Sequence, residues 1–248
     1  MDYQNAIEIN NLCKAFKGFT LDNVSLSITK GTIMGFVGQN GAGKSTTIKA
    51  ILNIIKNDSG TISVFGMDHI ANERKIKQRI AAVFDENPFN DVLNAKEINA
   101  IMRRIYSKWE PHTFMNYLEC FGLPINKAIG QFSKGMKMKL QIAAALSHNA
   151  ELLIMDEPTS GLDPVVRNEI LDVFEEYVKD GNHTIFLSSH ITSDLERIAD
   201  SITYIHNGRL LLTDTKENIL KHYKTLDEVL LSYVGAQSQY RWNEGGTV

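Results

Sequence analysis

The fold is decided by residues 38–45, which read Gly38-Gln39-Asn40-Gly41-Ala42-Gly43-Lys44-Ser45. This stretch fits the pattern G-x-x-x-x-G-K-[ST], and it lies between an apolar run at 33–37 and helical spacing of apolar residues at 45–55. Its glycines let consecutive backbone N–H groups curl around an anion, and the helix that follows contributes the positive end of its dipole. The stretch therefore predicts a phosphate-binding loop for a nucleoside triphosphate.

Two side chains of this loop are expected to have specific tasks. Lys44 is expected to reach the β- and γ-phosphates, and the Ser45 hydroxyl is expected to bind Mg²⁺. A glycine-rich turn that fits the pattern by chance is the alternative. The strand before the turn and the helix after it argue against chance.

A pair of carboxylates follows a second apolar run. Residues 152–155 read as a buried strand that leads into Asp156 and Glu157. An aspartate at the carboxyl end of such a strand is placed to bind Mg²⁺ beside the loop. Pro158 favours an extended backbone at Glu157, so the two acidic side chains should diverge, and Glu157 should orient or deprotonate the attacking water. The alternative is an acidic pair that caps a strand in solvent.

His190 stands at the end of a further strand-like run, 184–187, after Ser188 and Ser189. An imidazole at that position can hydrogen-bond the γ-phosphate and respond to its presence. The alternative is a solvated histidine, which is how the other six histidines are interpreted.

A helix start without an obvious ligand lies at Gln131-Phe132-Ser133-Lys134-Gly135-Met136, before the amphipathic run 136–146. Ser133 is a good N-cap, and Gly135 leaves the first turn open to close approach. Such a helix start attracts anions, and it is expected to cap the γ-phosphate bound by a second copy of the chain. An ordinary capped helix is the alternative.

The order of apolar patterns predicts the fold class. Strands are expected around 7–9, 24–28, 33–37, 61–65, 80–84, 152–155 and 184–187, and helices at 45–55, 94–120, 136–146, 166–178 and 193–198. Strands that alternate with helices indicate an α/β protein with a mostly parallel sheet. The strand-free stretch 87–147 reads as a helical insertion, and 226–233 reads as a short amphipathic segment before a polar tail.

The amino-acid composition excludes several classes of function. The 26 Lys and Arg and 29 Asp and Glu residues give a net charge of −3, so no basic field points to nucleic acid. Cys13 and Cys120 lie far apart without metal-ligand spacing, which favours a reducing compartment. Apolar runs stay far below the ~20 residues that span a bilayer, so we expect a soluble chain.

Taken together, the motifs resemble the nucleotide-binding domain of ABC transporters over about residues 5–215. The matching segments, in order, are 38–46, Phe132-Ser133-Lys134-Gly135-Met136, 152–157, Ser160-Gly161-Leu162-Asp163 and Ser188-Ser189-His190. This resemblance implies a P-loop NTPase core with a mostly parallel sheet, an antiparallel β-subdomain near the N-terminus and a helical subdomain. It places the ATPase domain at 1–225, with the core at 1–86 and 148–225 and the helical subdomain at 87–147, and leaves 226–248 as a C-terminal segment and tail.

The resemblance also assigns site residues. Glu157, His190 and Lys44 become catalytic, and Ser45, Asp85 and Asp156 become metal ligands. Ser133 and Gly135 would contact ATP across a dimer, Asp163 would belong to the loop that links the two sites, and Phe16 would stack on adenine, with Phe19 as a weaker candidate. The implied nucleotide-binding residues are Phe16, Gly38, Asn40, Gly41, Gly43, Lys44, Ser45, Thr46, Ser133, Gly135 and Asp163.

Two positions depart from the pattern of the family. Lys134 and Met136 stand where the signature more often has glycine and glutamine. Asp85 aligns with a glutamine that normally touches the metal and the membrane subunit, and Glu86 lies one position away. A carboxylate there can bind Mg²⁺ directly or through water, and a solvent-facing acidic loop is the alternative.

The implied function is that of an ATP-hydrolysing subunit that uses ATP and Mg²⁺. Two copies, or one copy and a paralogue, would close around two ATP molecules and push on a separate membrane permease through a groove around residues 85–110. The chain would lie peripherally on the cytoplasmic face of the membrane. The Ser-Lys-Gly-Met signature resembles that of ATPases serving exporters of small molecules, lipids and peptides, including the amphipathic toxin peptides called phenol-soluble modulins. The alternatives are a nucleotide-sensing regulator without transport and an ATPase that acts on DNA or ribosomes.

Overall fold

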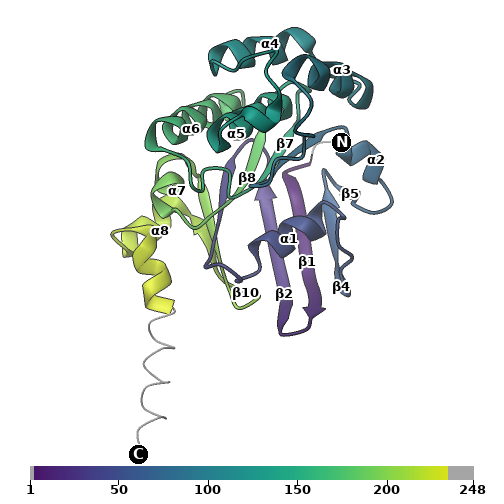
Figure 1. Cartoon of the computed structure of the whole chain (residues 1–248). Helices are drawn as coiled ribbons and strands as arrows, with labels where there is room; N and C mark the ends of the chain where they lie inside the picture. The colour runs from purple at the N-terminus through teal and green to yellow at the C-terminus, as the bar shows by residue number, and fades with distance from the viewer. Residues whose placement is uncertain (1–2, 234–248) are drawn as a thin grey trace, which may run out of the picture.

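The computed structural model describes residues 3–233 and contains two β-sheets covered by helices (Figure 1). The first sheet is antiparallel, with strand order β2-β1-β4-β5. Its strands are β1 (Asn5–Phe16), β2 (Phe19–Thr29), β4 (Ser59–Val64) and β5 (Met67–Asp68). This sheet confirms the expected antiparallel β-subdomain near the N-terminus.

The second sheet is mixed and mostly parallel, with strand order β10-β9-β3-β8-β7-β6. Only β10 runs antiparallel to its neighbour in this six-stranded sheet. The strands are β3 (Ile33–Val37), β6 (Ile80–Val83), β7 (Leu152–Asp156), β8 (Thr184–Ser189), β9 (Ser201–His206) and β10 (Arg209–Thr215). The parallel core confirms the predicted α/β class.

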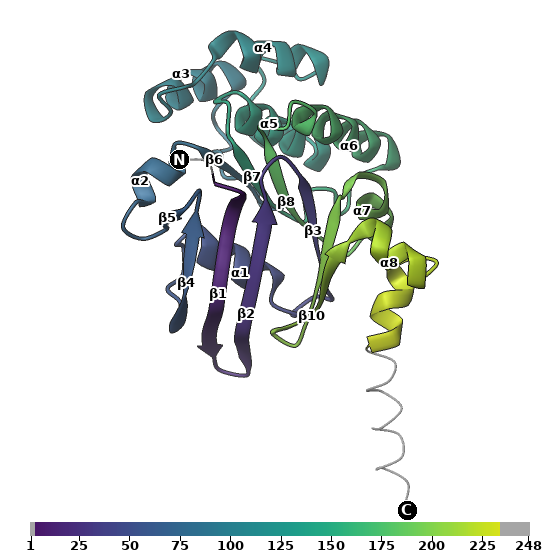
Figure 2. The ribbon, with the colours of Figure 1, turned by 180° about the vertical axis from the view of Figure 1, so that it is seen from behind.

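Helices cover both faces of the second sheet. They are α1 (Lys44–Ile51), α2 (Glu73–Lys77), α3 (Ala95–Ile105), α4 (Pro111–Cys120), the 3₁₀ turn η1 (Ile129–Gln131), α5 (Lys134–Leu146), α6 (Pro164–Val178), α7 (Thr192–Ile198) and α8 (Lys216–His222). Seen from behind, the antiparallel sheet lies in front of α1, while α5 and α6 lie on the far side of the parallel strands (Figure 2).

Two apolar cores explain this layering. Along β7, Leu153 and Met155 face the core shared with α5 and α6, whereas Leu152 and Ile154 face the core shared with α1 and the antiparallel sheet. Because successive side chains of a strand point to opposite faces, a strand buried on both faces reads as a continuous apolar run. This is why the buried strands were recognisable in the sequence.

The helical stretch expected at 94–120 is two helices in the structure. The chain leaves the helical conformation at Tyr106, and α4 begins with Pro111 at its first turn. Proline fits the first turn of a helix but not its interior, so it marks a new start. Similarly, α1 ends at Ile51, before the expected end at residue 55. The regular elements described between β6 and β7 are all helical, and the proposed division of the chain at 87 and 147 stays a prediction.

The sequence did not predict β5, β9, β10, α2 or α8. The elements β5, α2 and α8 are short and β10 is only partly buried, so their apolar pattern is weak. The strand β9 has six residues, four of them buried, and was missed in spite of that pattern. Residues 226–233 are helical and bury Leu226 and Val229, in agreement with the expected amphipathic segment. The polar tail from 234 to 248 lies outside the described residues.

Within residues 3–233, no helix combines the length and the apolar character needed to cross a bilayer.

The turn between β9 and β10 ties the two sheets to the phosphate-binding loop. Gly208 in this turn accepts a hydrogen bond from Asp22 N at 2.9 Å and donates one to the carbonyl oxygen of Ala42 at 2.9 Å. Its φ is +77°, and a Cβ at this position would overlap the carbonyl oxygen of Thr20. Glycine is therefore required at this position both for its conformation and for the close approach of β2.

We predict that Gly208→Ala lowers the free energy of unfolding by more than about 3 kcal/mol, because strain and a backbone overlap add. Gly122→Ala is the matched control, since its φ is +63° and a Cβ there meets nothing within 4 Å. The control should lose only about 1 kcal/mol. Urea unfolding of both variants measures the difference, and equal losses would contradict the packing role of Gly208.

Candidate nucleotide site

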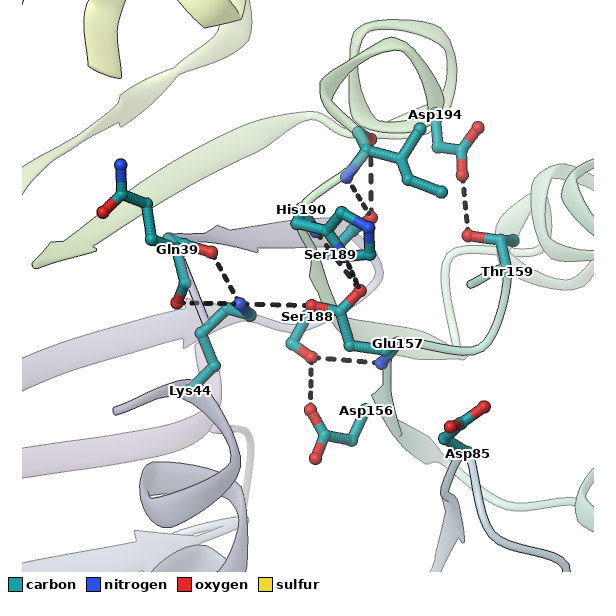
Figure 3. Close-up of polar contacts among 12 residues, drawn as sticks. Gln39, Lys44, Asp85, Asp156, Glu157, Thr159, Ser188, Ser189, His190 and Asp194 are labelled. Atoms are coloured by element: carbon teal, nitrogen blue, oxygen red, sulfur yellow. Dashed lines mark hydrogen bonds and ion pairs between the residues drawn. The ribbon is translucent and has the colours of Figure 1, made fainter. Parts of the chain in front are cut away.

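The site lies where three neighbouring parallel strands end. In the register of the sheet, Val37 of β3 lies opposite Ser189 of β8, and Asp156 of β7 lies opposite Ser188. The segments that follow these strands therefore meet at one edge of the sheet, which is the usual place for ligands in open α/β sheets. Figure 3 shows that Lys44, Glu157 and His190 converge there.

The loop after β3 has the geometry of an anion cradle. Gly41 and Gly43 have φ values of +81° and +117°, and Gly43 begins α1 without a side-chain cap. Lys44 is only 5% exposed, and its Nζ donates to the carbonyl oxygens of Gly38 at 2.6 Å and Gln39 at 3.3 Å. An uncapped helix start beside a buried ammonium group fits the phosphates of a nucleotide. Of the other loop residues, Ser45 and Thr46 are half-buried and Asn40 is exposed.

The carboxylate of Glu157 joins Lys44 to His190. Its Oε1 lies 3.1 Å from Lys44 Nζ, and its Oε2 lies 2.6 Å from His190 Nδ1. The Glu157 side chain is 17% exposed and that of His190 is 45% exposed, so the pair lies at the mouth of the site. A carboxylate held between two nitrogen groups, and open to solvent on one side, can orient a water molecule and accept its proton.

The expected extended backbone at Glu157 is wrong. The φ of Glu157 is +55°, in the left-handed region. Its N–H is held by the carbonyl oxygen of Ser188 at 3.1 Å and by the Ser188 hydroxyl at 3.2 Å, and Ser160 N donates back to the carbonyl oxygen of Glu157 at 3.1 Å. These contacts override the local preference that Pro158 imposes. The two acidic side chains still diverge, because Glu157 points to Lys44 and Asp156 points to Ser188 (Figure 3).

Ser188 is the functional residue to which the sequence assigned no task. It is fully buried, and its hydroxyl donates to Asp156 Oδ1 at 2.6 Å while it accepts from Glu157 N at 3.2 Å. One hydroxyl therefore positions both acidic residues. A small polar residue near the end of the strand, two positions before His190, was the available signal, but only the parallel register shows what it touches.

A second network that the sequence missed holds the loop after Glu157. Asp194 of α7 is only 2% exposed; it accepts a hydrogen bond from Thr159 Oγ1 at 2.7 Å and pairs with Arg167 of α6. A buried carboxylate needs such partners to remain charged. This network fixes the loop that leads to Asp163. No local motif identified it, because its three members lie on separate elements.

The expected magnesium ligands lie apart in this structure. Asp156 stands beside Ser188, while Asp85 pairs with Lys134 Nζ at 2.6 Å, where both side chains are about half exposed. Figure 3 shows no bond between Asp85 and Asp156. In the described range, no three His, Cys, Asp or Glu side chains gather as a metal site. Mg²⁺ takes few protein ligands when phosphate and water supply the others, so Asp156 and Ser45 suit it, and the metal roles stay predictions.

Ser133, Gly135 and Asp163 lie at the starts of helices. The sequence predicted this position for Ser133. Its side chain accepts from Met136 N at 3.2 Å and caps α5, and a Cβ on Gly135 would lie 3.4 Å from Val166. Asp163 caps α6 by accepting from the N–H groups of Val165 and Val166. Their roles toward nucleotide stay predictions.

An aromatic pair lies next to the loop at the tip of β1 and β2. The ring of Phe16 is 6.5 Å from that of Phe19, and Phe19 Cζ is 3.1 Å from where a Cβ on Gly43 would be. Phe16 is 46% exposed, and Lys14 Nζ lies over its ring at 5.6 Å from the centroid. Contact of Phe16 with adenine stays a prediction.

Comparison with known proteins places this geometry in a family. The family model described as ABC transporter matches residues 21–160. The bacitracin transport ATP-binding protein BcrA of Bacillus licheniformis is 39% identical over 215 residues, 86% of this chain and 70% of that protein. The lantibiotic transport ATP-binding protein SrtF of Streptococcus pyogenes is 36% identical over 219 residues, 86% of this chain and 93% of that protein. A solved ATP-binding subunit of an ABC transporter superposes with a TM-score of 0.84 at 28% identity, covering 92% of this chain and 98% of that one.

We predict that Ser188→Ala lowers the rate of ATP hydrolysis about tenfold, because Asp156 and Glu157 each lose a hydrogen bond that fixes them. Ser189→Ala is the matched control, since the Ser189 hydroxyl contacts Ile191 and neither acidic residue. A phosphate-release assay compares the two variants. Equal rates for Ser188→Ala and the wild type would show that the hydroxyl does not position the acidic pair.

Proposed function

The chain belongs to the ABC transporter family as an ATP-binding subunit, and we propose that it hydrolyses ATP to drive export through a separate membrane subunit. The observation that carries this proposal is the position of Glu157 between Lys44 Nζ at 3.1 Å and His190 Nδ1 at 2.6 Å. A chain that only sensed nucleotide would not require a carboxylate held at the mouth of the phosphate site.

In the proposed reaction, Lys44 leaves Glu157 and binds the β- and γ-phosphates. The phosphates carry more negative charge than one carboxylate, so they are the stronger partner for the ammonium group. Glu157 is then free to orient the attacking water and take its proton. His190 hydrogen-bonds the γ-phosphate. Ser45 and Asp156 would hold Mg²⁺, with Asp85 reaching it through water, and the ion would neutralise charge on the phosphates.

Two copies of the chain, or one copy and a paralogue, would form the active unit. Ser133 is exposed at the start of α5, and Gly135 adds no side chain to that turn. A helix start of this kind suits the γ-phosphate bound by the second copy. Asp163 lies exposed on the adjacent loop, where it would connect the two nucleotides.

The membrane partner is proposed to dock over the groove around residues 85–110. A cavity of about 420 Å³ lies there, lined by β6, the segment 88–93, α3 and α5. The chain would therefore lie on the cytoplasmic face of the membrane. The bacitracin and lantibiotic names of the two relatives support a hydrophobic or amphipathic substrate such as a peptide, lipid or drug. An amphipathic toxin peptide of the phenol-soluble-modulin class is the narrowest version of this proposal.

We predict that Glu157→Gln binds ATP with nearly unchanged affinity but loses at least about 100-fold in turnover, because the amide cannot accept the proton of water. With ATP present, the variant should accumulate as a dimer in size-exclusion chromatography. Glu110→Gln serves as the control, because Glu110 is exposed and, although it stands at the N-cap position of α4, its side chain makes no capping hydrogen bond. Turnover near the wild-type rate would remove Glu157 from the base role and favour the nucleotide-sensing alternative.

We predict that Ser133→Arg abolishes hydrolysis and leaves ATP binding to the isolated monomer unchanged, because the new side chain blocks only the site of the opposite copy. Thr215→Arg is the control, because Thr215 likewise caps a helix, α8, through its side chain. Both variants lose a cap worth about 1 kcal/mol, so only the dimer contact distinguishes them. Fluorescent-nucleotide binding and phosphate release measure the two effects; hydrolysis that survives in Ser133→Arg would refute capping across the dimer.

A further inference from the structure

Two cavities meet along one face of α5. The larger, about 420 Å³, is mainly apolar and is lined by side chains such as Phe89, Ile98 and Met102. The smaller, about 350 Å³, is polar and includes Asp85, Asn87 and Lys134. Gln141, in the second half of α5, lines both cavities.

Gln141 is a polar side chain without a partner. The residue is only 5% exposed, yet its Oε1 has no hydrogen-bond partner among the described residues. An amide oxygen buried in this way lowers the stability of the isolated chain. A side chain that carries such a cost is explained when a ligand supplies the missing hydrogen bond.

Two other buried polar atoms at the cavities, Asn87 Oδ1 and His148 Nδ1, also lack a partner. Asn87 donates to the carbonyl oxygen of Phe89 at 2.8 Å, which leaves its Oδ1 without a partner. His148 Nε2 lies 3.1 Å from the carbonyl oxygen of Ile80, and Nδ1 has no hydrogen-bond partner. Burial holds the pKa of His148 below its ordinary value, against the opposing effect of nearby backbone carbonyls. No donor among the described residues that line the two cavities reaches these atoms.

The face of α5 between these atoms is shaped for a close neighbour. Gln141, Ala144 and Ala145 line the larger cavity from one face of α5, and His148, two residues beyond the end of the helix, lines it as well. The two alanines leave room for the side chains of an approaching segment.

We propose that Gln141 selects the docking segment of the membrane subunit: the segment fills the larger cavity with apolar side chains and donates a hydrogen bond from a neutral side chain to Gln141 Oε1. This inference rests on the proposed docking of the membrane subunit over this groove. A purely apolar segment would leave Gln141 Oε1 without a partner, as it is in the isolated chain, and would bind more weakly than a segment that supplies the donor. A charged donor would lose its hydration among apolar neighbours, so a hydroxyl or amide is the fitting donor.

The test uses the full chain and the membrane subunit that co-isolates with it, identified by mass spectrometry and reconstituted in nanodiscs. Gln141→Met keeps the length of the side chain and removes the acceptor, and Gln141→Glu keeps an acceptor at the same place. We expect Gln141→Met to raise the Kd for the membrane subunit about tenfold and Gln141→Glu to raise it no more than about threefold. The isolated Gln141→Met chain should also melt about 3 °C higher, with unchanged ATP binding.

Two controls separate this inference from the proposed function. Gln4→Met makes the same substitution at an exposed position and should change neither the Kd nor the melting temperature. Ala82→Arg blocks the larger cavity from an exposed position on its lining and should abolish docking. If Ala82→Arg binds normally, the proposed docking groove is wrong. If Ala82→Arg fails to bind while Gln141→Met binds like the wild type, the docking groove stands and the role of Gln141 is overturned. The role of Gln141 is also overturned if Gln141→Glu binds as weakly as Gln141→Met.

Discussion

Parallel hydrogen bonding of β8 between β3 and β7 is the constraint on which the site depends. It brings together three segments, 38–45, 156–157 and 188–190, that are far apart along the chain. The register pairs Asp156 with Ser188, and the Ser188 hydroxyl then reaches both acidic residues. A slip of one residue would turn Ser188 to the opposite face of the sheet. The apolar residues of β7 and β8, buried on both faces, fix that register.

Glu157 shows how the fold stabilises an unfavourable backbone conformation at a functional residue. A left-handed non-glycine residue costs on the order of 1–3 kcal/mol. Here the hydrogen bond from Glu157 N to the carbonyl oxygen of Ser188 offsets that cost, as do the contacts of the side chain with Lys44 and His190. The conformation turns the carboxylate toward the phosphate loop. A strained residue at this point therefore serves the geometry of the site.

Local chemistry accounts for what the sequence could predict. The loop at 38–45 directly follows β3 and leads into α1, so strand, glycine turn and helix form one continuous segment. The N-cap at Ser133 likewise depends only on its own helical turn. Contacts between distant segments account for what it could not. The left-handed Glu157 depends on Ser188, the network of Asp194 joins α6, α7 and a loop, and the turn at Gly208 is fixed by Thr20. The break between α3 and α4 is an intermediate case, because Pro111 was visible in the sequence but an amphipathic pattern spans it.

Asp85 and Lys134 illustrate how two separate departures from the family pattern become a single feature in three dimensions. The carboxylate follows β6 of the core, the ammonium opens α5, and 2.6 Å separates them. Both side chains are about half exposed, and an ion pair in that setting contributes about 0–1 kcal/mol, so it does not hold the fold together. Its consequence is electrostatic. The ammonium group of Lys134 neutralises the negative charge of Asp85. The pair therefore links the loop after β6 to the start of α5.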